Sequence, residues 1–186
     1  MRIIAGAFKN RRLKAPDWPG LRPTSDKLRE TLFNILAPRM EGARVLDGYA
    51  GTGAVGIEAL SRGAAHVTFV ERDARAAALI ADNLRHCGVE NRYAIIRAGF
   101  AGTERPPGGG SFDLIFLDPP YGAAELAAAL AAAEPLVDAG TLLIVEHAKR
   151  DAPPERAGVL ARTRTLTSGD SALAFYARAE LPGSAG

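Results

Sequence analysis

The feature that most constrains the fold of this chain is a regular alternation of strand-like and helix-like segments that begins near residue 43. Five short apolar segments lie at 43–47, 66–71, 93–97, 112–118 and 140–146, and the stretches between them favour helices. Strands that alternate with helices pair in parallel and form a sheet with helices on both faces. The pattern therefore predicts a doubly wound, Rossmann-like α/β sheet.

The alternation stops near the C-terminus, where two strand-like segments, 159–168 and 171–178, flank Gly169-Asp170. Two residues of this type favour a tight β-hairpin turn. The hairpin adds two antiparallel strands to the five parallel ones, so we expect a sheet of seven strands. Residues 181–186 are expected to form a flexible tail.

The first forty residues follow a different pattern. Residues 2–13 can form a small hairpin, and a helix then begins with Thr24 or Ser25 as its N-cap and ends at Pro38. A chain of 186 residues fits a single domain. We therefore expect this basic hairpin-plus-helix extension, residues 1–40, to belong to the same domain as residues 41–180.

The composition excludes several classes of protein. With 47% hydrophobic and 24% charged residues, the chain is neither disordered nor fibrous. It has no apolar stretch long enough for a membrane span, no pattern of a secretory signal, and a single cysteine, Cys87. We therefore expect a cytoplasmic protein with no membrane contact. His66, His86 and His147 have no metal-ligand spacing with Cys87, so we expect no metal site.

The charge is distributed unevenly along the chain. Residues 1–46 hold ten Lys/Arg and four Asp/Glu, a net charge of +6, although the whole chain carries only +2. A basic arm on a mildly acidic body indicates either a face that binds a polyanion or a solvated surface with no partner. If the partner is RNA, the expected phosphate contacts are Arg11, Arg12, Lys14 and Arg22.

A glycine-rich loop follows the first strand. Gly51, Gly53 and Gly56 fit the G-x-G-x-x-G pattern, and Glu71 lies twenty residues beyond Gly51, where it can bind ribose hydroxyls. These features suit a nicotinamide site, but glycines in a first crossover can also be purely structural. Asp47, immediately before the loop, would oppose a pyrophosphate and suits a ligand with an ammonium group. S-adenosylmethionine is such a ligand.

The most informative motif is Asp118-Pro119-Pro120-Tyr121, at the carboxyl end of the fourth strand. In an open α/β sheet this position should face the glycine loop. Two prolines fix the backbone and remove two N–H donors, which leaves a rigid rim of acceptors. Such a rim suits an exocyclic amine on a nucleobase, because two acceptors on its N–H bonds direct the nitrogen lone pair toward an electrophile. Tyr121 would stack on the base.

Together these motifs resemble those of class I amino methyltransferases. Segments 2–6, 21–36 and 56–63 are also similar to the opening part of the RsmD family, so the resemblance covers nearly the whole chain. It implies a class I methyltransferase fold and S-adenosylmethionine as cofactor. It further implies methylation of a guanine N2 amine in 16S ribosomal RNA, within the small ribosomal subunit.

Two departures from the family pattern concern the cofactor site. Gly48 stands where a bulkier residue is usual, and residues 97–100 lack the acid or amide that commonly holds the adenine amine. We expect backbone groups to hold adenine there, with Phe100 packed against it. The expected cofactor residues are Asp47, Tyr49, Gly51, Gly53, Glu71, Arg72, Ala98 and Phe100.

Four alternatives to an rRNA enzyme remain at this point. One is a DNA adenine or cytosine amino methyltransferase, which the absence of a target-recognition domain opposes, and another is a protein-glutamine methyltransferase. A nicotinamide oxidoreductase is opposed by Asp47 and by the lack of a catalytic His or Tyr-Lys pair. The fourth is a non-catalytic ribosome-assembly factor, which the intact Asp118–Tyr121 motif opposes. We expect the protein to be a monomer.

Overall fold

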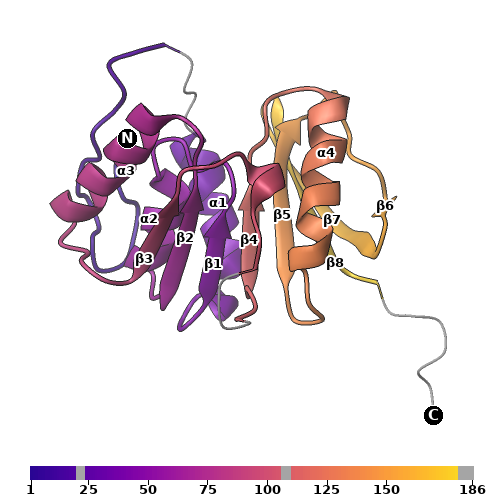
Figure 1. The fold of residues 1–186 in the computed structure, drawn as a ribbon, viewed down its shortest axis with the longest axis horizontal. Coiled ribbons are helices and arrows are strands. Elements are labelled where there is room, and N and C mark those ends of the chain that lie inside the picture. The colour runs from indigo at the N-terminus through magenta and orange to yellow at the C-terminus, as the bar shows by residue number, and fades with distance from the viewer. Residues whose placement is uncertain (20–23, 106–109, 180–186) are drawn as a thin grey trace.

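A computed structural model describes residues 1–19, 24–105 and 110–179 (Figure 1). Arg22 and the expected tail at 181–186 lie outside the described residues. The described part forms one sheet in the order β3-β2-β1-β4-β5-β8-β7-β6. Its strands are β1 (Arg44–Asp47), β2 (His66–Val70), β3 (Tyr93–Ile96), β4 (Leu114–Leu117), β5 (Leu142–Ala148), β6 (Arg156–Ala157), β7 (Leu160–Ser168) and β8 (Ser171–Arg178).

The sheet confirms the doubly wound α/β fold and its C-terminal hairpin. Strands β1 to β5 are parallel, whereas β8 pairs antiparallel with β5, β7 with β8, and β6 with β7. The expected number of seven strands is wrong, because the described residues contain eight. The additional strand, β6, has only two residues, too few to produce a periodic pattern in the sequence.

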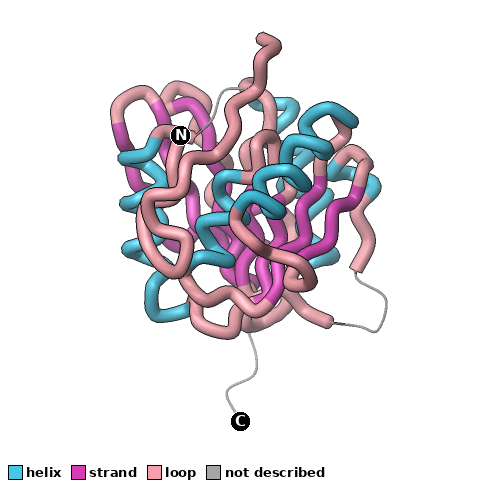
Figure 2. The backbone as a smooth tube through the Cα atoms, turned by 90° about the vertical axis from the view of Figure 1, so that its left-hand side faces the viewer, coloured by secondary structure: helices cyan, strands magenta, loops and turns pink. Residues whose placement is uncertain are grey.

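Helices cover both faces of the sheet (Figures 1 and 2). Helices α1 (Asp26–Leu36), α2 (Ala54–Ser61) and α3 (Ala74–His86) contribute to one core cluster, and α4 (Ala123–Ala133) contributes to the other. Neighbouring residues of a strand point to opposite faces, so Val45 belongs to the first cluster and Leu46 to the second. In the described chain no helix is long and apolar enough to cross a membrane.

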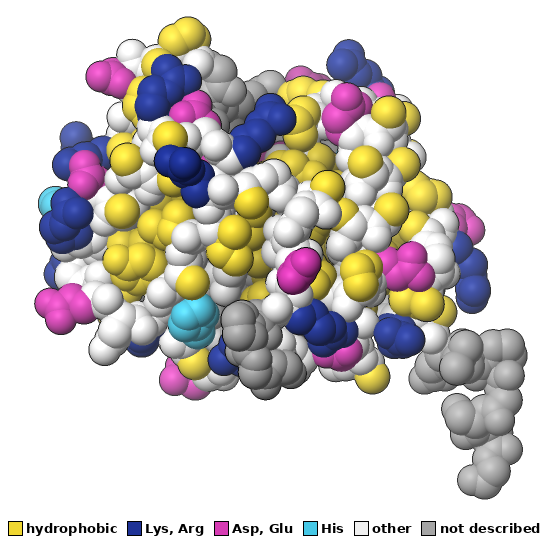
Figure 3. All heavy atoms as spheres, in the orientation of Figure 1, with side chains coloured by type: hydrophobic (Ala, Val, Ile, Leu, Met, Phe, Trp, Pro, Cys, Tyr) yellow, Lys and Arg dark blue, Asp and Glu magenta, His cyan; other side chains and the backbone are white. Residues whose placement is uncertain are grey.

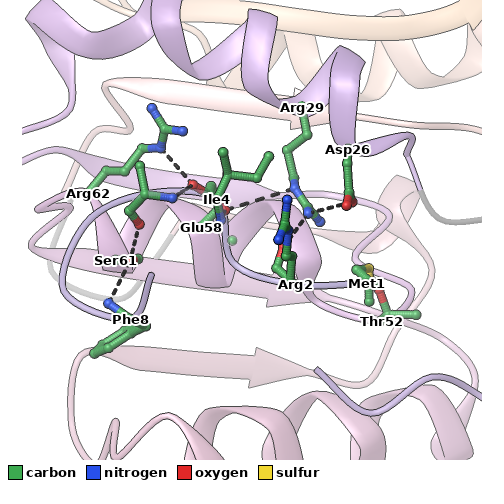
Figure 4. Close-up of polar contacts among 12 residues, drawn as sticks. Met1, Arg2, Ile4, Phe8, Asp26, Arg29, Thr52, Glu58, Ser61 and Arg62 are labelled. Carbon is green, nitrogen blue, oxygen red and sulfur yellow. Dashed lines mark hydrogen bonds and ion pairs between the residues drawn. The ribbon is translucent and has the colours of Figure 1, made fainter. Parts of the chain in front are cut away.

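The N-terminal segment packs against α2 and α1 rather than standing apart. The expected hairpin is a short antiparallel pairing, with a bridge between Arg2 and Arg12. The Glu58 carboxylate, buried on α2, accepts hydrogen bonds from the backbone N–H groups of Ile4 (2.8 Å) and Ala5 (3.0 Å). The buried Arg29 of α1 donates to the Arg2 carbonyl at 2.6 Å (Figure 4). These contacts hold the N-terminal segment against α1 and α2.

Helix α1 begins as its sequence predicts. Ser25 is the N-cap, and its hydroxyl accepts a hydrogen bond from the Leu28 N–H at 3.2 Å. Thr24, the other expected cap, donates its hydroxyl to the Glu146 carboxylate on β5 at 2.9 Å. The start of α1 is therefore tied to the carboxyl end of the parallel sheet.

Candidate functional site

A cavity of about 610 Å³ lies at the carboxyl edge of the parallel strands, in the size range of small-molecule sites. It forms where β1 lies between β2 and β4, so the chain leaves β1 in opposite directions along the sheet. Ligands of open α/β sheets bind at this topological switch point. The lining residues come from the end of β2 and from the segments that follow β1, β2, β3 and β4, together with the N-cap of α1 and residues of α4, β5 and β8.

Asp47 is the last residue of β1 and is only 1% exposed. Its Oδ2 accepts a hydrogen bond from the Gly56 N–H in the first turn of α2, at 3.0 Å. Burial raises the pKa of the Asp47 carboxyl to about 7, the Gly56 hydrogen bond opposes the rise, and the nearby Glu71 carboxylate adds to it. A neighbouring cation would favour the ionised form of Asp47. This carboxyl therefore suits a ligand that carries an ammonium group.

Asp47 does not line the large cavity itself. It lines a small adjoining cavity of about 40 Å³, which shares Tyr49, Gly51 and Asp118 with the large one. The Asp47 carboxyl is therefore separated from the large cavity, and Gly51 lines both spaces. Gly53, with a φ of +78°, is the N-cap of α2 and lines neither cavity. Its left-handed conformation turns the loop into the helix.

Glu71 follows β2 on the wall of the large cavity. Its Oε2 accepts the Gly51 N–H at 2.9 Å, and its Oε1 accepts the Asp73 N–H at 2.8 Å. Each carboxylate oxygen has a further lone pair. Two backbone donors thus hold Glu71 in one orientation and leave it able to accept bonds from vicinal hydroxyls, such as those of a ribose.

Gly48 and Phe100 explain one departure from the family pattern. A Cβ at Gly48 would collide with the side chains of Leu117 and Phe100. The Phe100 ring is 3% exposed and lies 5.4 Å, centroid to centroid, from the ring of Tyr49. Phe100 therefore fills the space that a larger residue at position 48 would occupy. Ala98 and Phe100 both line the cavity here.

The motif Asp118–Tyr121 directly follows β4, and all four residues line the cavity. Strands β1 and β4 are neighbours, as expected, and the Gly48 N–H donates to the Phe116 carbonyl at 2.8 Å. This bond holds the glycine loop beside the end of β4. Tyr121 is 48% exposed, so its ring can be covered by a planar ligand at the cavity mouth.

The structure thus brings most of the predicted site residues together. Tyr49, Gly51, Glu71, Arg72, Ala98, Phe100 and the Asp118–Tyr121 motif surround the large cavity. The predicted site set leaves out nine other lining residues, of which Glu146 is the most notable because it is a buried carboxylate. The nine are Ser25, Gly48, Val70, Gly99, Ala101, Glu125, Ala128, Glu146 and Ser171. An acid in the fifth strand was the signal that could have identified Glu146.

Two of the residues predicted to bind phosphates, Arg11 and Lys14, contact α3. Arg11 donates to the carbonyl of His86, the last residue of that helix, at 3.0 Å, and Lys14 pairs with Asp82 at 3.2 Å. Helix α3 connects parallel strands, so it runs from the carboxyl edge of the sheet to the opposite edge. Arg11 therefore lies far from the cavity, about 20 Å along a helix of 13 residues. Arg12 is exposed.

The surface charge does not form one basic patch on the face drawn in Figure 3. Dark-blue Lys and Arg side chains are dispersed there and interleaved with acidic ones. In the described residues, no group of three His, Cys, Asp or Glu side chains could hold a metal ion. The charged residues that line the two cavities are mostly acidic: Asp47, Glu71, Asp118, Glu125 and Glu146, together with Arg72.

This fold, with its cavity at the switch point, is that of a class I methyltransferase. The structure described as "Putative methyltransferase yhhF from Escherichia coli" has a TM-score of 0.82 and 33% identity, covering 96% of this chain and 98% of that chain. A methylase structure from Haemophilus influenzae, HI0767, has a TM-score of 0.77 and 31% identity, with the same coverage of 96% and 98%.

Residues 1–177 match the family described as "Conserved hypothetical protein 95". The chain belongs to this family, and the resemblance to RsmD is confirmed. "Putative rRNA methyltransferase YlbH" of Bacillus subtilis is 38% identical over 183 residues, 95% of this chain and 98% of that protein. "Ribosomal RNA small subunit methyltransferase D" of Haemophilus influenzae is 42% identical over 123 residues. That match covers 65% of this chain and 64% of the relative, just under two thirds of its length.

Proposed function

We propose that this protein transfers a methyl group from S-adenosylmethionine to the exocyclic N2 amine of a guanine in 16S ribosomal RNA. The observation that carries the proposal is the Asp118–Tyr121 motif in the wall of the same cavity as Glu71 and the glycine loop. The names of the relatives from B. subtilis and H. influenzae support an rRNA substrate. The name of the second relative also supports the small subunit.

The cavity fits S-adenosylmethionine in size and in chemistry. Glu71 would accept the ribose hydroxyls, Asp47 would favour the ammonium group electrostatically from the small adjoining cavity, and Phe100 would pack near adenine. Tyr49, Gly51, Gly53, Arg72 and Ala98 complete the proposed cofactor set. When bound, S-adenosylmethionine supplies an electrophilic methyl group on a sulfonium and leaves as neutral S-adenosylhomocysteine.

The residues after β4 would orient the nucleophile. The Asp118 carboxylate and the Pro119 carbonyl accept the two N–H bonds of the amine, which directs its lone pair toward the methyl carbon. The N–C bond then forms as the C–S bond breaks, and the acceptors stabilise the positive charge that develops on nitrogen. The surplus proton passes from nitrogen to Asp118. Pro120 keeps the rim rigid, and Tyr121 stacks on the base, a contact worth about 1–3 kcal/mol.

We also propose how the protein meets its substrate. Arg11, Arg12, Lys14 and Arg22 would contact phosphates, and the contacts of Arg11 and Lys14 with the C-terminal part of α3 support phosphate binding away from the target base. A folded particle, the small ribosomal subunit, would then present the base to the cavity. In this proposal the chain acts in the cytoplasm as a monomer, and residues 1–40 and 41–180 work as one domain.

The test is transfer of labelled methyl groups from S-adenosylmethionine to unmodified small subunits, naked 16S rRNA and DNA in parallel, followed by digestion to nucleosides. The expected product is N2-methylguanosine from small subunits. Asp118→Ala should abolish transfer while leaving the affinity for S-adenosylhomocysteine nearly unchanged. Label in DNA or protein, or no label despite cofactor binding, would refute the proposed substrate.

A further inference from the structure

The end of the sheet away from α3 carries a second concentration of positive charge (Figure 1). Residues after position 46 hold thirteen Lys/Arg and seventeen Asp/Glu, a net charge of −4, yet residues 156–168 of β6 and β7 hold three arginines and no acid. The three are Arg156, Arg162 and Arg164. They line a hollow of about 450 Å³ at this edge, where Glu155 is the one acid among the described lining residues. The hollow shares no lining residue with the cavity at the carboxyl edge.

A one-residue register shift, of the β-bulge type, determines which way two of these arginines point. Arg162 on β7 pairs with Tyr176 on β8, whereas Arg164 pairs with Phe175, so Thr163 is an extra residue in β7. Residues in register point to the same face of a sheet. Arg164 therefore lies on the Phe175 face, where its guanidinium carbon is 5.9 Å from the centroid of the Phe175 ring.

Arg156 lies on the same face as Arg164. Arg156 on β6 pairs with Ala161 on β7, which pairs with Ala177 on β8. Ala177 and Phe175 are two residues apart on one strand, so they point to the same face. Arg156 and Arg164 thus stand on adjacent strands of one face, about 10 Å apart along the strand direction.

These two arginines are available to a ligand, whereas Arg162 is already engaged. Arg162 donates to the Pro153 carbonyl at 2.6 Å and lies 3.7 Å from the Glu155 carboxylate. Arg156 and Arg164 are exposed, and within the described chain neither side chain forms a hydrogen bond or an ion pair. A guanidinium is always charged and presents a fork of N–H donors that matches a phosphate.

The edge of β7 favours a polyanion over a strand of another protein. In the described residues β6 pairs with β7 only at Leu160 and Ala161, so the rest of β7 has a free edge. A free edge can accept a further β-strand. The register shift at Thr163 and the arginines on both faces oppose such pairing. The same arginines and the hollow between them suit a phosphodiester backbone.

On the basis of the RNA substrate in the proposed function, we infer that Arg156 and Arg164 bind phosphates of the RNA away from the target base. Ser168 of β7 pairs with Ser171, which lines the large cavity. Arg164 lies four residues before Ser168, about 13 Å along the strand. A contact at this distance holds substrate and transition state equally, so its loss raises KM and leaves kcat unchanged.

The test is the double variant Arg156→Ala/Arg164→Ala. Binding to small subunits and to naked 16S rRNA is measured with S-adenosylhomocysteine present, between about 50 and 200 mM salt. The slope of log K against log salt should be shallower than that of the wild type by about two, one for each lost phosphate contact. Arg156→Lys/Arg164→Lys should restore most of the slope, because lysine also neutralises a phosphate.

Arg44→Ala/Arg92→Ala is the matched control, because it removes two arginines at the amino ends of β1 and β3, on other strands of the sheet. It should keep the wild-type slope, and the affinity for S-adenosylhomocysteine reports that each variant is folded. An unchanged slope in the double alanine variant would overturn the inference and leave the arginines as protection of the sheet edge. An equal loss of slope in the control would overturn it too.

Cross-linking distinguishes RNA from protein as the partner. Thr165→p-benzoylphenylalanine places a photo-cross-linker in the hollow, and on small subunits it should label rRNA. Labelling of a ribosomal protein alone would overturn the inference. A wild-type protein that binds rRNA with the expected salt slope but transfers no methyl group would overturn the proposed function and leave the inference standing. A wild-type protein that binds neither small subunits nor naked 16S rRNA would overturn both.

Discussion

Replacement of Asp47 by asparagine should make the protein more stable at neutral pH and less able to bind its cofactor. The Asp47 carboxyl is buried, and its pKa is raised from 3.8 to about 7 in the folded protein. Between these two values the folded state binds more protons than the unfolded state, so stability is lost as the pH rises through this window. Asparagine has nearly the same shape and can still accept the Gly56 N–H, but it does not ionise.

The size of the effect follows from the shift. A rise from 3.8 to about 7 corresponds to roughly 4 kcal/mol between pH values below and above the window. Urea unfolding followed by circular dichroism, from pH 4 to pH 8, should show the stability difference between Asp47→Asn and wild type growing by up to this amount. The comparison within one background cancels the titration of other groups. If the stability difference between the two proteins stayed constant with pH, the raised pKa of the Asp47 carboxyl would be refuted.

The same carboxyl predicts a pH dependence of cofactor affinity. An ammonium beside Asp47 favours ionisation, so binding of S-adenosylmethionine should release a proton and tighten as the pH rises toward 7. Above that pH the affinity should level off. Isothermal titration calorimetry in buffers of different ionisation enthalpy would measure the released proton, and Asp47→Asn should remove both the pH dependence and the release.

Three further predictions concern the loops and the arm. Gly6→Ala should lower the free energy of unfolding by about 2–3 kcal/mol in urea, because the new Cβ would collide with the backbone of Ser61. Gly42→Ala is the control: Gly42 also has a positive φ, +74°, but open space around it, so the loss should be only about 1 kcal/mol. Gly48→Ala should weaken S-adenosylhomocysteine binding, and Phe100→Leu should restore part of the loss, whereas simple additivity would contradict the packing argument. Arg12→Ala should weaken binding to small subunits and reduce the salt slope by about one; an unchanged slope would exclude a phosphate contact.

The parallel sheet could be predicted because the hydrophobic pattern of each segment agrees with its place in the fold. β4 is apolar throughout and lies in the middle of the sheet, and the acids at the ends of β1 and β2 are where the switch-point rule places a site. Strand β6 could not be predicted, since it exists only through its pairing with β7. The glycine loop was located by its spacing alone.

The sequence was less informative where partners are distant in the chain. Glu146 was read as the end of a strand over 140–146, whereas β5 continues to Ala148 and carries Glu146 into the cavity wall beside the preceding strand. Lys14 looked like a free phosphate contact, but it pairs with Asp82, 68 residues away. Sequence periodicity cannot predict such contacts, because they depend on how the N-terminal segment packs against α3.

The bonds that tie residues 1–24 to α2 and to β5 also set an order for folding during synthesis. The partner of Ile4 on α2 is made 54 residues later, whereas the partner of Thr24 on β5 is made 122 residues later. At roughly 5–20 residues per second, the second interval lasts on the order of 10 s. The arm can therefore dock on α2 early, while the wall formed by Thr24 and Glu146 can close only after most of the sheet has emerged from the ribosome.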